Sequence, residues 1–147
     1  ARGGTVDQAH LAALLENDYF ALKPPKSLDR EDFSNATLSG MAAADGAATL
    51  AALSVAAIVR AQDHFPAPVL RWLVTGGGRK NGFLMEKLAH GLAVPVDPVE
   101  AVGWDGDLLE AQAFAYLAVR SLSGMATSLP TTTGVPEPIC GGVLFKL

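Results

Sequence analysis

Three consecutive glycines, followed by two basic residues and an asparagine, form the part of this sequence most able to do chemistry (residues 76–81). An expected strand over residues 69–75 precedes them, and an expected helix over residues 83–92 follows. Glycines at a strand-to-helix turn let the backbone approach a ligand closely, and the helix N-terminus adds a partial positive charge that suits phosphate. The sequence therefore predicts contact with a nucleotide or a phosphate. The residues expected to make it are Gly76, Gly77, Gly78 and Asn81.

This glycine run matches neither of the two common phosphate-binding motifs. No Gly-Lys-Ser/Thr closes it, so it is not a P-loop, and Asn81 stands where the third glycine of Gly-x-Gly-x-x-Gly would follow Gly76 and Gly78. A dehydrogenase half of the Rossmann type is also disfavoured by this glycine spacing. A tight turn that needs a positive φ is the simpler alternative, although three consecutive glycines exceed what a turn requires.

The loop of residues 23–27 is a second candidate, because its two prolines exclude a helix and give a stiff, extended segment. Lys26 in this loop and Arg30 just beyond it could face an anionic ligand. On residue chemistry alone, a solvated loop whose prolines limit its flexibility explains the same residues and is the favoured interpretation.

Glu110 is the third candidate, near the start of a helix expected over residues 108–122. Its carboxylate could accept a hydrogen bond from a sugar hydroxyl at the same rim as the glycine turn. A carboxylate early in a helix is stabilised by the helix dipole in any case, so the residues alone favour this structural explanation.

The histidines and the single cysteine indicate no metal site and no covalent catalysis. His10, His64 and His90 are scattered, and none has a partner three or four residues further on that would make a metal-binding face. Cys140 cannot form an internal disulfide and has no obvious histidine partner, and no Gly-x-Ser-x-Gly sequence is present. A single free cysteine fits a reducing cytoplasm, which is the expected location.

The composition is that of one ordinary folded domain with an acidic surface. Of the 147 residues, 50% are hydrophobic and 18% are charged, which excludes a disordered chain. The net charge is -4 and no run of Lys and Arg overrides it, so we expect no nucleic-acid partner and no anionic lipid surface. The longest apolar run, residues 47–59, is shorter than the roughly 20 residues that span a bilayer, so no membrane segment is expected.

Helices and strands alternate along the chain, which predicts an α/β layered domain. The expected helices cover residues 6–17, 45–62, 83–92 and 108–122, with Thr5, Asp45 and Asp107 as N-caps of the first, second and fourth, and the expected strands cover residues 69–75 and 94–96. The long alanine-rich helix carries few charges, so we expect it to be largely buried. Residues 129–134 are expected to form a loop, and the apolar residues 139–145 are expected to enter the core.

The candidate motifs belong to a longer series that runs through almost the whole chain. The series consists of Tyr19-Phe20, Lys23-Pro24-Pro25-Lys26-Ser27, Arg30-Glu31-Asp32-Phe33, Ala48-Thr49-Leu50, Gly76-Gly77-Gly78-x-x-Asn81 with Leu84-Met85, Leu109-Glu110-Ala111-Gln112-Ala113-Phe114-Ala115, Leu129-Pro130 and Thr133-Gly134. In this order it resembles the C-terminal part of the anhydro-N-acetylmuramic acid kinase family, which is similar to the wider sugar kinase, Hsp70 and actin group of two-domain ATPases. The combination is far more specific than any single stretch.

The resemblance implies a fold, an activity and a set of ligands. Residues 1–147 would form the three-layer C-terminal lobe of the sugar kinase, Hsp70 and actin (ribonuclease H-like) type. Such enzymes use ATP with Mg²⁺ to phosphorylate 1,6-anhydro-N-acetylmuramic acid while water opens its anhydro ring, giving N-acetylmuramic acid 6-phosphate in cell-wall recycling. Carried over, the glycine run and Asn81 would contact the nucleotide, Glu110 would face the sugar, and the loop from Lys26 to Arg30 would line or support the cleft between the lobes.

The resemblance also implies that half of the cleft lies outside this chain, whose first residues read as a cut inside a longer one. Family members have an N-terminal lobe with a Gly-Thr-Ser-type phosphate loop and an aspartate general base, and neither motif occurs here. Phosphoryl transfer needs these groups together, so no catalytic residue is assigned to this chain and we expect no kinase activity from it alone. Exposed apolar area predicts association, as a homodimer. The alternative function is a non-enzymatic dimerisation or interaction module derived from the same fold.

Overall fold

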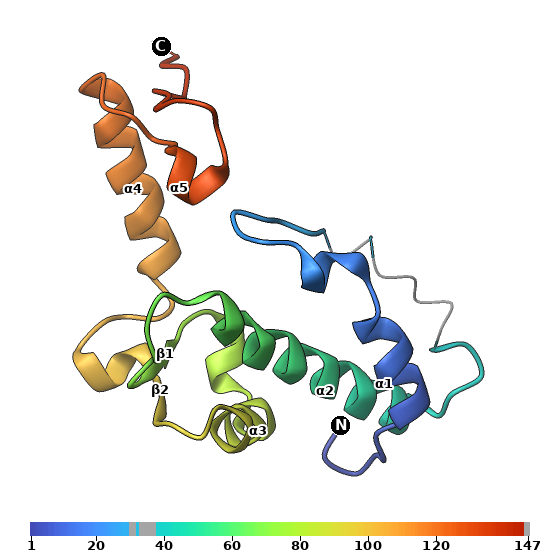
Figure 1. Ribbon diagram of the computed structural model, residues 1–147. Helices are drawn as coiled ribbons and strands as arrows, with labels where there is room; N and C mark the ends of the chain where they lie inside the picture. The colour runs from blue at the N-terminus through green and yellow to red at the C-terminus, as the bar shows by residue number, and fades with distance from the viewer. Residues whose placement is uncertain (30–31, 33–37, 146–147) are drawn as a thin grey trace.

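The computed structural model describes residues 1–29, 32 and 38–145, and most of the regular structure in them is helical. In chain order the elements are α1 (Gln8–Leu15), the 3₁₀ helix η1 (Asp18–Ala21), α2 (Ala43–Ala61), η4 (Gln62–His64), β1 (Trp72–Val74), η5 (Gly77–Lys80), α3 (Gly82–Leu92), β2 (Val96–Pro98), η6 (Val99–Val102), α4 (Leu109–Leu122) and α5 (Pro130–Thr133). Figure 1 shows α4 rising away from the body that α1 to α3 and the sheet form, with the C-terminal segment folded back beside it.

The sheet consists of β1 and β2, which pair in parallel. The partners are Trp72 and Val96, Leu73 and Asp97, and Val74 and Pro98. Parallel strands need a crossover connection, and α3 supplies it here. The prediction of a mixed helix and strand domain is therefore confirmed, although both strands are short and the second begins two residues later than expected.

The core lies around α2, which packs against α1 and α3. Gly91 of α3 permits the close approach of α2, because an added Cβ would lie 3.0 Å from Cγ2 of Val59 and 3.3 Å from Cγ1 of Val55. The buried apolar residues of the described chain are Leu14, Ala48, Leu53, Leu88, Leu92 and Val99. They come from α1, α2, α3 and η6, so this small core supports the sheet and the turn that follows β1.

α2 is less buried than its composition predicts. Its buried residues are Ala48, Thr49 and Leu53, while Leu50 is 40% exposed, so the expectation of a largely buried helix is wrong. Together with η4 it is also long and apolar enough to cross a membrane (Ala43–His64, mean hydropathy 1.4), contrary to the expectation drawn from residues 47–59 alone. Length and composition show no more than this, because a core helix passes the same test, and α2 does pack against two other helices.

Two hydrogen bonds join the N-terminal segment to α2. They involve Thr5 and Asp45, which the sequence analysis expected to act as helix N-caps. The N–H of Thr5 donates to Oδ1 of Asp45 at 2.7 Å, and the N–H of Asp7 donates to Oγ1 of Thr49 at 3.0 Å. The N-cap of α1 is Asp7 rather than Thr5, and the N-cap of α2 is Ala42, three residues before the predicted Asp45, which lies inside the first turn. Thr49, which is fully buried, thus joins the two segments.

We expect Thr49→Val to lower the free energy of unfolding by about 1–3 kcal/mol, because the part-buried N–H of Asp7 loses its acceptor on the buried Thr49 side chain. Ser54→Ala is the matched control on the same helix. Thr49 and Ser54 both donate to the carbonyl four residues earlier, but Ser54 is exposed. Urea denaturation of the two variants measures the difference, and equal losses would show that the bond to Asp7 contributes nothing.

The C-terminal third departs furthest from the sequence prediction. Residues 130–133 form α5 rather than a loop, because Pro130 suits the first turn of a helix and Gly134, with φ of +74°, ends it. Residues 139–145 do not enter the core: Ile139 is 43% exposed, Val143 77% and Phe145 86%. The apolar character of this stretch was read correctly, but nothing in the described chain covers it.

The start of α4 also differs from the expectation. Its N-cap is Leu108 and not Asp107, and Leu108 makes no side-chain capping bond. Instead, Oδ1 of Asp105 accepts hydrogen bonds from the N–H groups of Asp107 at 2.9 Å and Leu108 at 3.2 Å. This leaves the Asp107 carboxylate available for another partner.

Candidate functional site

The glycine turn, defined here as residues 76–81, leaves the end of β1 in an unusual conformation. Gly76 has φ of +69° and ψ of -173°, a region that is open essentially only to glycine. The chain then forms η5, a 3₁₀ helix that was not predicted, before α3 begins. An added Cβ on Gly76 or Gly77 would meet no atom within 4 Å, so the outer side of this turn is open. The backbone could therefore be approached closely by a ligand.

Asn81 closes the glycine turn as the N-cap of α3. Its side-chain Oδ1 accepts hydrogen bonds from the N–H groups of Phe83 and Leu84, both at 3.2 Å. This structural role explains an asparagine at the position, because its side chain satisfies the free N–H groups of a helix start. A contact between Asn81 and a nucleotide stays a prediction.

Arg79 clamps the glycine turn to the loop that precedes α4. Its Nε lies 2.8 Å from Oε1 of Glu100, its Nη2 lies 3.0 Å from Oδ1 of Asp107, and its Nη1 donates to the carbonyl of Gly76 at 2.9 Å. The Arg79 side chain is only 5% exposed, whereas both carboxylates are accessible. Arg79 is therefore committed to holding the backbone of the turn.

Gly106 lies directly on the guanidinium of Arg79. An added Cβ at this position would collide with Nε of Arg79, and the backbone N–H of Gly106 donates to Oε1 of Glu100 at 3.2 Å. Its carbonyl accepts from the hydroxyl of Thr75 at 3.3 Å. Gly106 therefore joins the loop before α4 both to Thr75, at the end of β1, and to Glu100, a partner of Arg79.

Lys80 adds a second link between the glycine turn and the loop before α4. Its Nζ donates to both carboxylate oxygens of Asp107, at 2.9 and 2.8 Å. Glu110 follows three residues later, exposed in the first turn of α4. The Lys80 link therefore joins Asp107, just before α4, to the glycine turn, while a place for Glu110 at the same rim stays a prediction.

The charges of this cluster shift one another's pKa values. The pKa of Glu100 is lowered, first by a hydrogen bond from its own backbone N–H and then by Arg79. The pKa of Asp107 is lowered by Lys80 and next by Arg79, while Glu100 in return raises the pKa of Arg79. Each of these three shifts favours the charged form of its group, which strengthens the links of Arg79 to Glu100 and Asp107.

Lys26 lies elsewhere, and its ammonium group is engaged within its own neighbourhood. Its Nζ donates to the carbonyl of Tyr19 at 2.9 Å and lies 4.6 Å from the centre of the Tyr19 ring and 3.3 Å from Nε2 of His64. Figure 1 shows this blue N-terminal loop apart from the green end of β1. Arg30 falls outside the described residues. The structure therefore does not bring Lys26 to the glycine turn.

The comparisons with known proteins decide the family. The model of one family, "Anhydro-N-acetylmuramic acid kinase", matches residues 1–146. The chain belongs to this family. It is 59% identical over 145 residues to the anhydro-N-acetylmuramic acid kinase of Rhodospirillum rubrum, 55% over 149 residues to that of Acidiphilium cryptum, and 53% over 145 residues to that of Paramagnetospirillum magneticum. The resemblance inferred from the sequence is confirmed.

The chain spans only about two fifths of the length of these kinases. The matches cover 99%, 99% and 97% of the chain but 39%, 41% and 41% of the Rhodospirillum, Acidiphilium and Paramagnetospirillum proteins. About three fifths of each relative therefore lies outside the match. The names of these relatives therefore do not assign the function of an entire anhydro-N-acetylmuramic acid kinase to this chain.

ATP and Mg²⁺, which a kinase family implies, fit the described residues to different degrees. The open glycine turn offers backbone that a nucleotide phosphate could approach, since Cβ atoms on Gly76 and Gly77 would fill empty space. No three His, Cys, Asp or Glu side chains within residues 1–29, 32 and 38–145 come together to hold a metal ion. The described part of this chain therefore leaves open space for a phosphate at the turn, and it groups no metal-binding side chains.

The sequence analysis missed the ion pairs of Arg79 that shape this candidate site. Arg79 and Lys80 were seen only as members of the glycine motif, Asp107 was assigned as a helix cap, and Glu100 was not considered. The available signal was a pair of basic residues directly after the glycines, together with acidic residues shortly before α4. Without coordinates nothing indicated that these two segments meet.

Proposed function

We propose that this chain is the C-terminal, nucleotide-binding lobe of a two-lobe carbohydrate kinase. The complete enzyme would transfer phosphate from ATP to 1,6-anhydro-N-acetylmuramic acid while water opens the anhydro ring, giving N-acetylmuramic acid 6-phosphate for cell-wall recycling. The lobe would have the three-layer fold of the sugar kinase, Hsp70 and actin group. The single observation that supports this best is the open glycine turn, held by Arg79 against the start of α4.

The residues of this chain would bind and orient the substrates. Gly76 to Gly78 would lie against the nucleotide phosphates, Asn81 would fix the end of that turn, and Glu110 would face the sugar from the first turn of α4. Lys26 and Arg30 would support the cleft rather than contact phosphate, since the Lys26 ammonium is already occupied by carbonyls. ATP would bring Mg²⁺ with it.

The remaining groups would come from the N-terminal lobe. Its phosphate loop and its aspartate general base are needed together with this half of the cleft, so the chain alone should show no sugar-dependent ATP turnover. A cytoplasmic location follows from this role and stays a prediction.

The test is a calorimetric titration of the chain with Mg-ATP and with ADP. Gly77→Asp places a negative charge in the open space above the turn, so we expect nucleotide affinity to fall about tenfold or more through repulsion from the phosphates. Gly77→Asn is the matched control, because it has the same size without the charge and the φ of Gly77 is not positive.

The outcomes separate the competing functions. A loss in Gly77→Asp with little change in Gly77→Asn supports a phosphate at the turn. Equal binding by all three forms places the nucleotide elsewhere. No binding by any form, together with a stable dimer in sedimentation analysis, favours the interaction module, for which the exposed apolar residues of α4 are the specific observation.

A further inference from the structure

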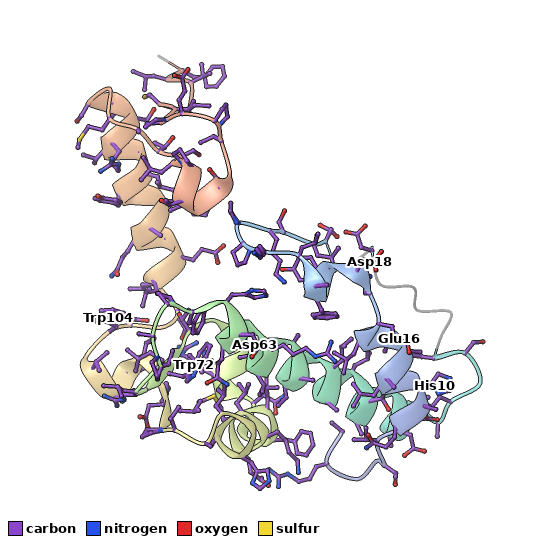
Figure 2. All side chains as sticks on the ribbon, viewed as in Figure 1. His10, Glu16, Asp18, Asp63, Trp72 and Trp104 are labelled. Carbon is purple, nitrogen blue, oxygen red and sulfur yellow. The ribbon has the colours of Figure 1, made fainter. Side chains whose placement is uncertain are left out.

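α4 carries a large apolar surface for which the described chain provides no cover. None of its 14 residues is buried, and Phe114 is 64% exposed, Val119 62% and Leu122 65%. Figure 2 shows its side chains projecting from the ribbon away from the α1 to α3 body. Exposed patches of this kind mark interaction sites in folded proteins, and an isolated helix of this length is marginal in water.

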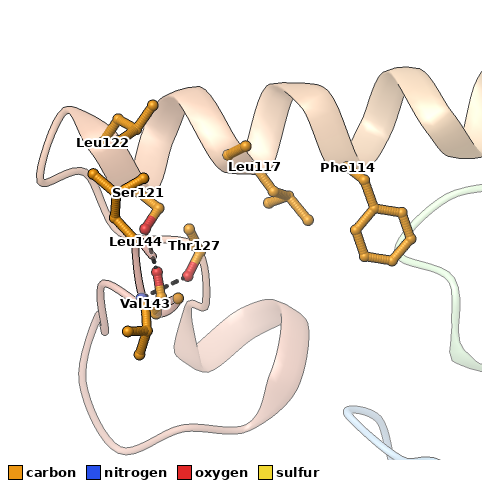
Figure 3. Close-up of a pocket in the computed structure, with 10 residues that line it drawn as sticks. Phe114, Leu117, Ser121, Leu122, Thr127, Val143 and Leu144 are labelled. Carbon is orange, nitrogen blue, oxygen red and sulfur yellow. Dashed lines mark hydrogen bonds between the residues drawn. The ribbon is translucent and has the colours of Figure 1, made fainter. Parts of the chain in front are cut away.

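One side of this surface forms a groove with the C-terminal segment. The groove has a volume of about 470 Å³ and lies between α4 and residues 141–144 (Figure 3). The residues that shape it are Phe114, Leu117, Ala118, Leu122, Val143 and Leu144, which we call the α4 face. The whole set is apolar, and no charged residue among those that the structure describes lines the groove.

The polar groups at the edge of the α4 face are already used. The hydroxyl of Ser121 donates to the carbonyl of Gly141 at 2.6 Å, and the N–H of Gly141 donates to Oγ1 of Thr127 at 2.9 Å. These bonds hold the C-terminal segment beside α4 and leave Val143 and Leu144 pointing outward, 77% and 63% exposed. The side chains of the α4 face are all apolar, so they suit an apolar protein surface better than a sugar, a nucleotide or another polar ligand.

We infer that the α4 face is where the missing three fifths of the kinase packs, an inference that rests on the proposed function. In each relative named above, about three fifths of the same single chain lies outside the matched part. A segment of the same chain acts at a high effective concentration, so it covers this face before a second copy can. The links from Lys80 and Arg79 to Asp107 fix the base of α4 at the glycine turn, so the segment that covers the α4 face also closes over the candidate site.

Hydrogen exchange followed by mass spectrometry tests the inference on two proteins. One is the isolated chain, and the other is a chimera that joins this chain to the three fifths of the Rhodospirillum rubrum kinase that it does not match. We expect amides of α4 and residues 141–145 to exchange about tenfold or more slowly in the chimera, because burial against a second body suppresses local opening. Should the chimera fail to fold, the same peptides in the intact Rhodospirillum kinase provide the comparison.

Variants then identify the face itself. Phe114→Asp combined with Leu122→Asp should abolish the added protection, while Leu70→Asp, at a residue 85% exposed outside α4, should leave it unchanged. Gly77→Asp in the chimera should keep the protection of α4 even where nucleotide binding is lost, so a failure of the proposed function is distinguishable from a failure of this inference. Equal exchange in chain and chimera overturns the inference, as does protection in the isolated chain that grows with its concentration, which would assign the face to a second copy.

Discussion

Gly76→Ala is expected to lower the free energy of unfolding by about 1–3 kcal/mol and to weaken nucleotide binding with it. Gly76 has φ of +69° and ψ of -173°, and a residue with a Cβ is strained there by about that amount. Space is not the obstacle, because the added methyl group would meet no atom within 4 Å. The cost therefore comes from the backbone, and the chain would relieve it by rotating the peptide that carries the Gly76 carbonyl.

That rotation would also release the clamp. The Gly76 carbonyl accepts from Nη1 of Arg79 at 2.9 Å and from the backbone N–H of Arg79 at 3.3 Å, so both bonds depend on the glycine conformation. Urea denaturation measures the stability, and calorimetry with Mg-ATP measures the binding. Gly82→Ala is the control: it adds the same methyl group in open space, without a positive φ. Equal behaviour of the two variants would show that the turn does not need its special conformation.

The sequence predicted the position of the glycine turn because the signals for it are local. Glycines between an apolar strand and an amphipathic helix, with Asn81 at the helix start, specify a turn without reference to distant residues. The partners of that turn could not be predicted in the same way. Glu100 and Asp107 lie more than twenty residues further along, and they reach Arg79 only because β2 pairs in parallel with β1 and carries the following loop to the same edge.

The failures at the C-terminus have a different physical cause. Residues 139–145 were correctly recognised as apolar, but an apolar pattern states only that a surface prefers burial and says nothing about which chain covers it. In the described chain Leu144 is 63% exposed and Phe114 64%. The partners of a charged side chain are equally hard to predict from the sequence. Lys26 was considered as a ligand for an anion or as a solvated residue, but in the structure its ammonium group donates to the carbonyls of Tyr19 and Phe20.

Arg79→Met is expected to lower kcat/KM of the chimera by about 100-fold, because a positioning loop displaced by roughly 1 Å costs about that much. Methionine keeps most of the length and the apolar stem of arginine but removes the three links to Glu100, Asp107 and the Gly76 carbonyl. Lys80→Met is the matched control. It removes an exposed link to the same Asp107, and exposed pairs contribute little. A chimera that keeps its activity in both variants would show that the glycine turn does not depend on Arg79.

The pH dependence of stability separates the charge of Arg79 from its packing. The native pKa values of Glu100 and Asp107 lie below the ordinary carboxylate value of about 4, so these groups stabilise the fold above that pH. Their contribution disappears as the pH falls through the ordinary value to the native one. Arg79→Met removes one of the causes that lower these two pKa values, so the gap in urea midpoint between the natural chain and the variant should be smaller at pH 3 than at pH 7. A difference in urea midpoint that is the same at both pH values would mean that Arg79 stabilises the fold only through the packing of its aliphatic side chain. A difference that shrinks in acid identifies the ion-paired guanidinium as the group that holds the glycine turn.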